Sequence, residues 1–217
     1  MTLSDGRRIS TLKKDQLSSK CLRWVHHDGV GYVFLRPQAV TVAAKVQTGR
    51  QSDISTESKD TRLVRRKVFS TWIDHGTQPD DATYEYIVLP GKTAAEMQGW
   101  KNSFRTIVNN EAVQAVACDT KGLFGIAFYT AGQTIALTPD LQVGVDRPCL
   151  LLIELGEDGY SVSLSDPTAS LQGEVLVSFY TSRDESAPTN AGSQLNIQLP
   201  MGEFTGSTVT KVYHPDK

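Results

Sequence analysis

The segment Trp24-Val-His-His-Asp-Gly-Val-Gly-Tyr-Val-Phe34 contains two strand-like arms on either side of Asp28-Gly29. A type I′ turn joins two antiparallel strands and requires positive φ at both central residues, which an Asp-Gly pair adopts at little cost. The segment therefore predicts a β-hairpin. It is typical of a chain built from short antiparallel strands.

Apolar and polar residues alternate through much of the remaining chain. Residues 160–164, 174–179 and 195–199 carry an apolar side chain at every second position, the pattern of strands with one buried face. Tyr84–Leu89 and Leu150–Leu155 are more uniformly apolar, and we expect them to be more deeply buried strands. Turn-forming pairs separate these segments, which favours a sandwich or barrel over a parallel α/β sheet.

One segment has the signature of a helix. Thr93-Ala-Ala-Glu96 has the spacing of a capping box and predicts a short helix from Ala94 to about Lys101. A helical fragment near Lys13–Ser18 is the other helical signal. The polar segment 183–192 reads as a surface loop. The predicted fold class is therefore all-β with one short helix.

Two prolines suggest the domain boundary. Pro139 and Pro148 bracket a short segment, and a new set of strands begins after it. We therefore predict one domain over residues 1–143 and a second over residues 144–217, with a short connection between them.

Composition excludes several classes of protein. The 217 residues carry 22 Lys and Arg against 24 Asp and Glu, a net charge of -2, which argues against a dedicated nucleic-acid partner. No apolar run is long enough to span a membrane. No signal peptide is recognisable after Met1. We expect Cys21, Cys118 and Cys149 to be free thiols, the last two buried, unless Cys21 pairs with another part of a longer protein.

The usual catalytic motifs are absent from the sequence. It has no nucleophile elbow, no zinc-binding His-Glu-x-x-His helix, no Cys-x-x-Cys pair and no phosphate-binding loop. We therefore assign no catalytic, metal or cofactor site. His26 and His27 are adjacent strand residues that point to opposite faces, so they are poorly placed to share a metal, and a structural role is favoured.

Asp74-His75 is the pair of residues that most resembles part of a catalytic triad. An aspartate can orient an imidazole, but no serine or cysteine is identified as a third member. We favour a structural role, in which the pair satisfies backbone groups of the loop Gly76–Ala82. On this interpretation His75 is buried and hydrogen-bonded, and it does not line an open cleft beside Trp72.

A basic cluster consists of Arg62, Arg65, Arg66 and Lys67. Such a cluster could attract a sulfated or uronic-acid polymer. Acidic residues lie just upstream, however, and we favour the simpler interpretation of a strand edge that charge protects from pairing.

Several of these segments together carry a resemblance to a known family. They are Trp24–Phe34, Gln47-Thr-Gly-Arg-Gln-Ser-Asp-Ile54, Val68-Phe-Ser-Thr-Trp-Ile-Asp-His-Gly-Thr-Gln-Pro79, Ala82-Thr-Tyr-Glu-Tyr-Ile-Val-Leu-Pro-Gly91 and Val162-Ser-Leu-Ser-Asp-Pro-Thr168. In this order they resemble the C-terminal half of polysaccharide lyase family 8, which contains hyaluronate, chondroitin and xanthan lyases.

The resemblance implies a three-part parent protein. An N-terminal α/α toroid precedes an antiparallel super-sandwich and a small C-terminal β-sandwich, and this chain would hold the end of the super-sandwich and the whole final domain. The implied reaction is β-elimination on an acidic polysaccharide outside the cytoplasm, in the extracellular space or the periplasm. The family's catalytic residues lie mainly in the toroid, so none is carried over to this chain, and its substrate-binding residues stay unknown.

The resemblance predicts a surface feature, and the sequence also allows an alternative function. As a piece of such a lyase, the chain would expose an apolar patch within residues 1 to about 90, where the rest of the super-sandwich would pack. The alternative is a free-standing carbohydrate-binding β-sandwich, for which Trp24, Trp72 and Trp100 are the candidate sugar-stacking residues.

Overall fold

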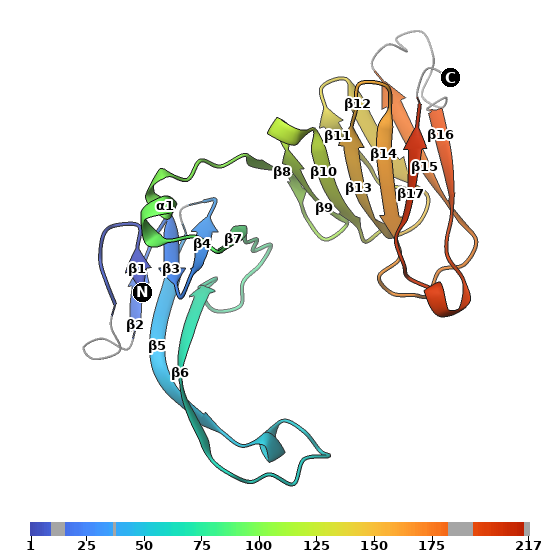
Figure 1. The fold of residues 1–217 in the computed structure, drawn as a ribbon. Coiled ribbons are helices and arrows are strands. Elements are labelled where there is room, and N and C mark those ends of the chain that lie inside the picture. The colour runs from blue at the N-terminus through green and yellow to red at the C-terminus, as the bar shows by residue number, and fades with distance from the viewer. Residues whose placement is uncertain (10–15, 37, 182–192, 215–217) are drawn as a thin grey trace. The chain divides into compact units, whose positions relative to one another are not determined.

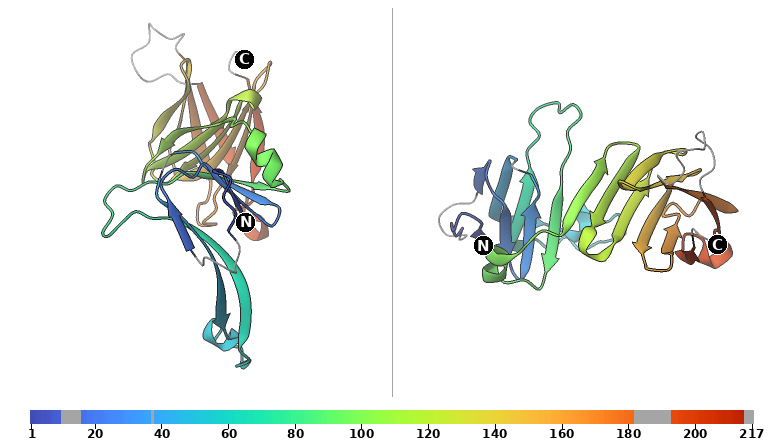
Figure 2. Two further views of the ribbon diagram at one scale, coloured as in Figure 1. Left: turned by 90° about the vertical axis from the view of Figure 1, so that its left-hand side faces the viewer. Right: turned by 90° about the horizontal axis from the view of Figure 1, so that it is seen from above.

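The computed structural model describes residues 1–9, 16–36, 38–181 and 193–214. It divides the chain into two compact units, Met1–Lys101 and Asn102–Lys217, and each unit is described by itself. Both units consist mainly of antiparallel strands (Figures 1 and 2), which confirms the all-β prediction. Within the described residues, no helix is both long and apolar enough to cross a bilayer.

The first unit contains two sheets. The four-stranded sheet has the order β1 (Thr2–Leu3), β3 (Trp24–His27), β4 (Val30–Phe34) and β7 (Tyr86–Pro90). The three-stranded sheet has the order β2 (Gln16–Ser19), β5 (Val40–Gly49) and β6 (Val64–Ile73). The turn between β3 and β4 has φ of 48° at Asp28 and 74° at Gly29, which confirms the predicted hairpin.

The core of the first unit draws side chains from both sheets. Leu17 of β2 and Phe69 of β6 pack against its seven buried members, which are Leu3, Ile9, Leu22, Val25, Phe34, Val40 and Val42. Because β2 is a strand, the helical fragment predicted near Lys13–Ser18 is wrong from Gln16 onward. Residues 13–15 and the predicted loop 183–192 lie outside the described residues.

The predicted helix is present as α1 (Ala94–Gly99). The Glu96 backbone N–H donates to the Thr93 hydroxyl at 3.3 Å, and the Thr93 N–H donates to the Glu96 carboxylate at 2.8 Å. Met97 packs against Trp24 and Val33, so the helix covers the face of the four-stranded sheet that points away from the main core. A Cβ at Gly31 would collide with the Met97 sulfur, and glycine there allows this close approach.

The second unit is a sandwich of two sheets. Its six-stranded sheet has the order β17 (Val209–Tyr213), β14 (Tyr160–Ser165), β13 (Cys149–Leu155), β10 (Leu123–Phe128), β9 (Val113–Cys118) and β8 (Phe104–Asn109). Its four-stranded sheet has the order β11 (Thr134–Thr138), β12 (Leu141–Val145), β15 (Glu174–Thr181) and β16 (Ser193–Gln198). One buried cluster, which includes Phe124, Ile153 and Phe179, joins the sheets. The described residues also form three short 3-10 helices, which are η1 (Gln51–Asp53) in the first unit and η2 (Asp119–Lys121) and η3 (Gly202–Phe204) in the second.

The predicted domain boundary at residue 143 is wrong. β10 pairs with β13, and β12 pairs with β15, so both sheets join residues from either side of that position. Pro139 lies in the connection between β11 and β12, and Pro148 lies where the chain passes from β12 to β13 in the other sheet. Pro139 therefore lies in a hairpin connection within one sheet, Pro148 marks a change of sheet inside the same sandwich, and the units divide between Lys101 and Asn102.

The two strands predicted to be deeply buried are instead exposed on one face. In β13 buried and exposed residues alternate, and Leu150 and Leu152 are exposed. In β7 the exposed fractions of Tyr86 and Val88 are 52% and 45%. Apolar content alone therefore overestimated burial in both cases.

The carboxylate of Asp166, which is 3% exposed, organises the turn after β14. Its oxygens accept hydrogen bonds from the Thr168 hydroxyl at 2.6 Å and from the backbone N–H groups of Thr168, Ser170 and Leu171 at 2.9, 2.8 and 2.7 Å. The hydrogen bonds, with that of the Thr168 hydroxyl the largest contribution, lower the pKa of Asp166 to about 2.

We expect Asp166→Asn to lower the free energy of unfolding of the second unit by about 2 kcal/mol at neutral pH, because hydrogen bonds to a charged group contribute roughly 1.5–3 kcal/mol. The folded pKa lies below the unfolded value of about 3.9, so the stabilisation is present above about pH 4 and is lost as the pH falls toward 2. Calorimetry should show this acid-dependent loss in the wild type and a flatter profile in the variant.

The matched control for this experiment is Glu157→Gln, which neutralises an exposed carboxylate in the same unit. All three tryptophans lie in the first unit, so tryptophan fluorescence reports that unit separately. An Asp166→Asn variant with the stability and acid dependence of the wild type would contradict the assigned role.

Candidate functional site

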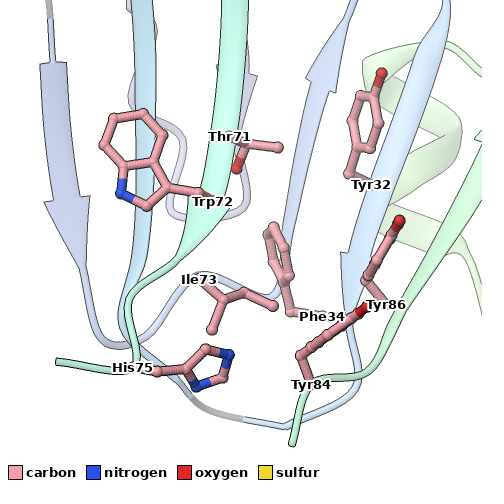
Figure 3. Close-up of a pocket in the computed structure, with 8 residues that line it drawn as sticks. All are labelled: Tyr32, Phe34, Thr71, Trp72, Ile73, His75, Tyr84 and Tyr86. Atoms are coloured by element: carbon pink, nitrogen blue, oxygen red, sulfur yellow. The ribbon is translucent and has the colours of Figure 1, made fainter. Parts of the chain in front are cut away.

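A pocket of about 490 Å³ lies in the first unit and is lined largely by aromatic side chains (Figure 3). It is formed between β6 of the three-stranded sheet and β4 and β7 of the four-stranded sheet. β6 and β7 are each the last strand of their sheet, so the pocket lies where both sheets have an open edge. Its lining residues are Tyr32, Phe34, Thr71, Trp72, Ile73, His75, Tyr84 and Tyr86.

Three rings form a partly stacked row along one wall of the pocket. The ring centroids of His75 and Tyr84 are 6.3 Å apart, and those of Tyr84 and Tyr86 are 6.2 Å apart at an interplanar angle of 24°. Tyr84 and Tyr86 are exposed. Trp72 is also exposed, but Figure 3 shows its indole directed to the other side of β6 from Ile73, as alternation along a strand requires.

The register of the sheet explains why these residues face the pocket. Tyr32 pairs with Val88, and Phe34 pairs with Tyr86, so all four share the face that points toward the core of the first unit. Ile87 and Leu89, which alternate with them, pack instead with Met97 of α1. β7 therefore carries an apolar row on its core-facing side that the three-stranded sheet leaves uncovered.

One polar atom in the pocket lacks a partner. The Thr71 hydroxyl is inaccessible to solvent and makes no hydrogen bond within the described part of the chain. A buried hydroxyl without a partner costs roughly 1–3 kcal/mol.

The structure separates the roles of Asp74 and His75. The Asp74 carboxylate accepts a hydrogen bond from the Gly76 N–H at 2.9 Å, which is a backbone contact of the kind predicted for the pair. The prediction of a buried, hydrogen-bonded His75 is wrong, because His75 is exposed and lines the pocket. β6 ends at Ile73, so His75 lies on the exit segment, where its ring meets Tyr84 and no backbone group.

The other histidine pair makes structural contacts. His26 Nε2 lies 2.8 Å from the Lys92 carbonyl oxygen, and the His27 ring stacks on Phe69 with centroids 4.7 Å apart. Burial lowers the pKa of His27. Within the residues that the structure describes, no group of three or more His, Cys, Asp and Glu side chains is placed to hold a metal ion.

The cysteines agree with the prediction, since all three are free thiols and only Cys21 is exposed. Burial raises the pKa of Cys149 to about 12. A hydrogen bond with the Thr120 hydroxyl lowers the pKa of Cys118. Neither thiol lines the pocket.

Among the tryptophans proposed for sugar stacking, Trp24 is buried and packs with Met97, and Trp100 packs beside it. Tyr84 and Tyr86, which are not among the residues predicted for sugar stacking, are more exposed than Trp24. Their spacing of two residues is the available signal, because side chains at alternate positions of a strand lie on the same face.

Two units built from antiparallel sheets follow one another along the chain. Family models of polysaccharide lyases match both units. The super-sandwich domain of polysaccharide lyase family 8 matches residues 1–100, and the C-terminal beta-sandwich domain of the same family matches residues 105–174. The chain belongs to polysaccharide lyase family 8.

Individual relatives carry the names of several lyases. The chain is 30% identical to a hyaluronate lyase of Thermasporomyces composti and 30% identical to chondroitinase-AC of Pedobacter heparinus, in each case over 86% of this chain. It is 28% identical to a xanthan lyase of Bacillus sp. over 85% of this chain. The alignments span 24%, 26% and 20% of those proteins, so the chain corresponds to about a quarter of their length.

Solved structures show the same fold. A Paenibacillus xanthan lyase matches 97% of this chain with a TM-score of 0.75 at 18% identity, and the match covers 21% of that protein. A chondroitinase AC lyase, solved in complex with oligosaccharides, matches 92% of this chain with a TM-score of 0.70 at 24% identity, and the match covers 31% of that protein.

We expect substitutions at Asp74 and His75 to differ in their effect on stability. Asp74→Ala removes the hydrogen bond to Gly76 and should lower the free energy of unfolding of the first unit by about 1 kcal/mol. His75→Ala removes an exposed side chain and should change it by no more than about 0.5 kcal/mol. Urea unfolding followed by tryptophan fluorescence measures both, and a larger loss for His75→Ala would contradict this assignment.

Proposed function

We propose that this chain is the C-terminal β region of a polysaccharide lyase that cleaves uronic-acid-containing polysaccharides by β-elimination, and that it supports the reaction without carrying it out. The observation that carries the proposal is the match, in order, of the family's super-sandwich and C-terminal sandwich domains. The names of the relatives point to acidic polysaccharides as the substrate class. Such polymers are too large to cross a membrane, so the lyase would act in the extracellular space or the periplasm.

The chemistry of the pocket supports a non-catalytic role. β-Elimination requires a base that removes the proton at C5 of the uronic acid and a group that stabilises charge developing on the adjacent carboxylate. His75 lines the pocket, and histidine is a type of residue that can act as a general base. The lining of the pocket, however, contains no Arg, Lys or Asn, so nothing there neutralises a sugar carboxylate.

The pocket is better explained as an interface with the rest of the lyase. Tyr86 and Val88 lie on the core-facing side of their sheet but stay about half exposed. The Thr71 hydroxyl lacks a hydrogen-bond partner in the described residues. Additional strands of a larger super-sandwich, placed beside β6 and β7, would cover the apolar row. In this role the chain needs the helical part of the lyase as its partner for catalysis.

A free-standing carbohydrate-binding module is the second candidate function. The stacked rings of Tyr84 and Tyr86 favour it, because aromatic faces pack on sugars. The two candidates differ in their response to oligosaccharides. Chemical-shift changes at Tyr84 and Tyr86 on addition of hyaluronan or chondroitin oligosaccharides would favour the module.

We expect the chain by itself to leave hyaluronan, chondroitin sulfate and xanthan intact, because the lining of the pocket pairs no carboxylate-neutralising group with His75. Absorbance of the unsaturated uronate product measures cleavage, and a longer protein that includes the helical region is the positive control. Turnover by the 217-residue chain at micromolar concentration would refute its non-catalytic role. Absence of turnover in the longer protein would refute the proposed activity.

We also expect the chain to self-associate through its uncovered β7 row. Replacing Tyr86 and Val88 with serine should raise the dissociation constant of the dimer at least tenfold, about 1.4 kcal/mol, because it removes exposed apolar surface at a sheet edge. The matched control replaces Val116 and Val212, two exposed apolar residues of the second unit. Sedimentation analysis measures association, and an equal effect of both double variants would contradict the role of β7.

A further inference from the structure

The hairpin of β5 and β6 extends well beyond the body of the first unit (Figure 1). The two strands pair over ten residues, from Val40 with Ile73 to Gly49 with Val64. β2 joins only the inner part, because its pairing with β5 runs from Val40 to Ala43. The outer part, Lys45–Lys67, is termed the arm here. Both of its strands are exposed along their length.

The arm concentrates positive charge in a chain whose net charge is negative. It contains seven Lys and Arg against three Asp and Glu, whereas the remainder of the chain contains 15 Lys and Arg against 21 Asp and Glu. Two of the three acidic residues are engaged within the arm. Asp60 forms an ion pair with Arg62 at 3.1 Å, and the Asp53 carboxylate accepts a hydrogen bond from the Arg50 N–H at 3.0 Å.

The three consecutive cations Arg65, Arg66 and Lys67 of β6 form no ion pair with a carboxylate of the described residues. The Arg66 guanidinium donates to the Arg65 carbonyl oxygen at 3.2 Å. The cations alternate between the faces of the ribbon. Arg66 lies opposite Gln47 on one face, and Arg65 and Lys67 lie opposite Thr48 and Val46 on the other.

This arrangement exceeds what protection of a sheet edge requires. A charge along an edge strand discourages pairing with another chain, but a single sign on both faces also repels itself and draws anions to the whole ribbon. A protein docked on one face would leave the cations of the other face unpaired. A polymer with a regularly repeated negative charge can contact both faces, and guanidinium groups bind carboxylate and sulfate through paired hydrogen bonds.

We propose that the arm is a binding element for acidic polysaccharide, in which Arg65, Arg66 and Lys67 contact the carboxylate or sulfate groups of the polymer. This inference rests on the proposed function, because that function supplies the polyanion. It adds a capture site that lies apart from the pocket and takes no part in bond cleavage.

The test measures binding of hyaluronan and chondroitin sulfate decasaccharides to the 217-residue chain by calorimetry. Replacing Arg65, Arg66 and Lys67 with glutamine should raise the dissociation constant about tenfold or more, because three exposed ion pairs of ordinary strength together contribute a factor of this size. Replacing all three with glutamate should abolish binding. Salt near 1 M should also abolish it, because the Debye length is then about 3 Å.

The matched control replaces Lys20, Lys101 and Lys121 with glutamine, which removes the same charge from exposed positions outside the arm. Its binding should stay within about twofold of the wild type because these lysines are not part of the arm. The tryptophan-reported unfolding midpoint should be unchanged in every variant. Equal loss of affinity in the arm variant and the control, or wild-type affinity in the arm variant, would overturn the proposal and leave the arm as a protein-docking or edge-protecting element. Cleavage by the longer lyase is measured separately, so the arm can fail while the proposed activity stands.

Discussion

Side chains at paired positions of antiparallel strands point to the same face of a sheet, and this constraint determines what the first unit needs from its surroundings. Phe34 belongs to the buried core, and its register partner Tyr86 must lie on the same face. The three-stranded sheet ends at β6 and leaves β7 uncovered. The pocket and its exposed rings are consequences of this unequal coverage.

The second unit satisfies the same constraint with its own two sheets. Phe179 of the four-stranded sheet stacks on Tyr213 of the six-stranded sheet, with ring centroids 4.7 Å apart, and Tyr160 lies 5.6 Å from Phe179. These rings and one continuous apolar cluster fill the space between the two sheets. The inner faces of this sandwich are therefore closed without a further element, whereas the first unit exposes part of its inner face. The two units would accordingly contribute differently to a larger lyase.

Local features of this fold could be predicted from sequence, and long-range features could not. The Asp28-Gly29 turn and the Thr93–Glu96 capping box depend on residues within a few positions of one another, and both are present. The domain boundary depends on the pairing of β10 with β13, which proline spacing does not report. The exposure of His75 and Tyr86 depends on which strand ends each sheet. A period-two pattern shows that one face is apolar, but it carries no information on whether another sheet covers that face.

The distribution of charge separates capture of a polymer from its cleavage. A group that stabilises developing negative charge must lie within hydrogen-bonding distance of one defined atom, and the lining of the pocket contains no Arg or Lys. Capture has a weaker requirement, since the field of several cations acts over roughly a Debye length, about 8–10 Å at physiological salt. Arg65 and Lys67 are exposed on one face of β6, and Arg66 is exposed on the other. Such side chains meet the requirement for capture but not the requirement for stabilising charge at one defined atom. If the proposed function holds, the same physical difference would let this region raise the concentration of a substrate that reacts elsewhere in the lyase.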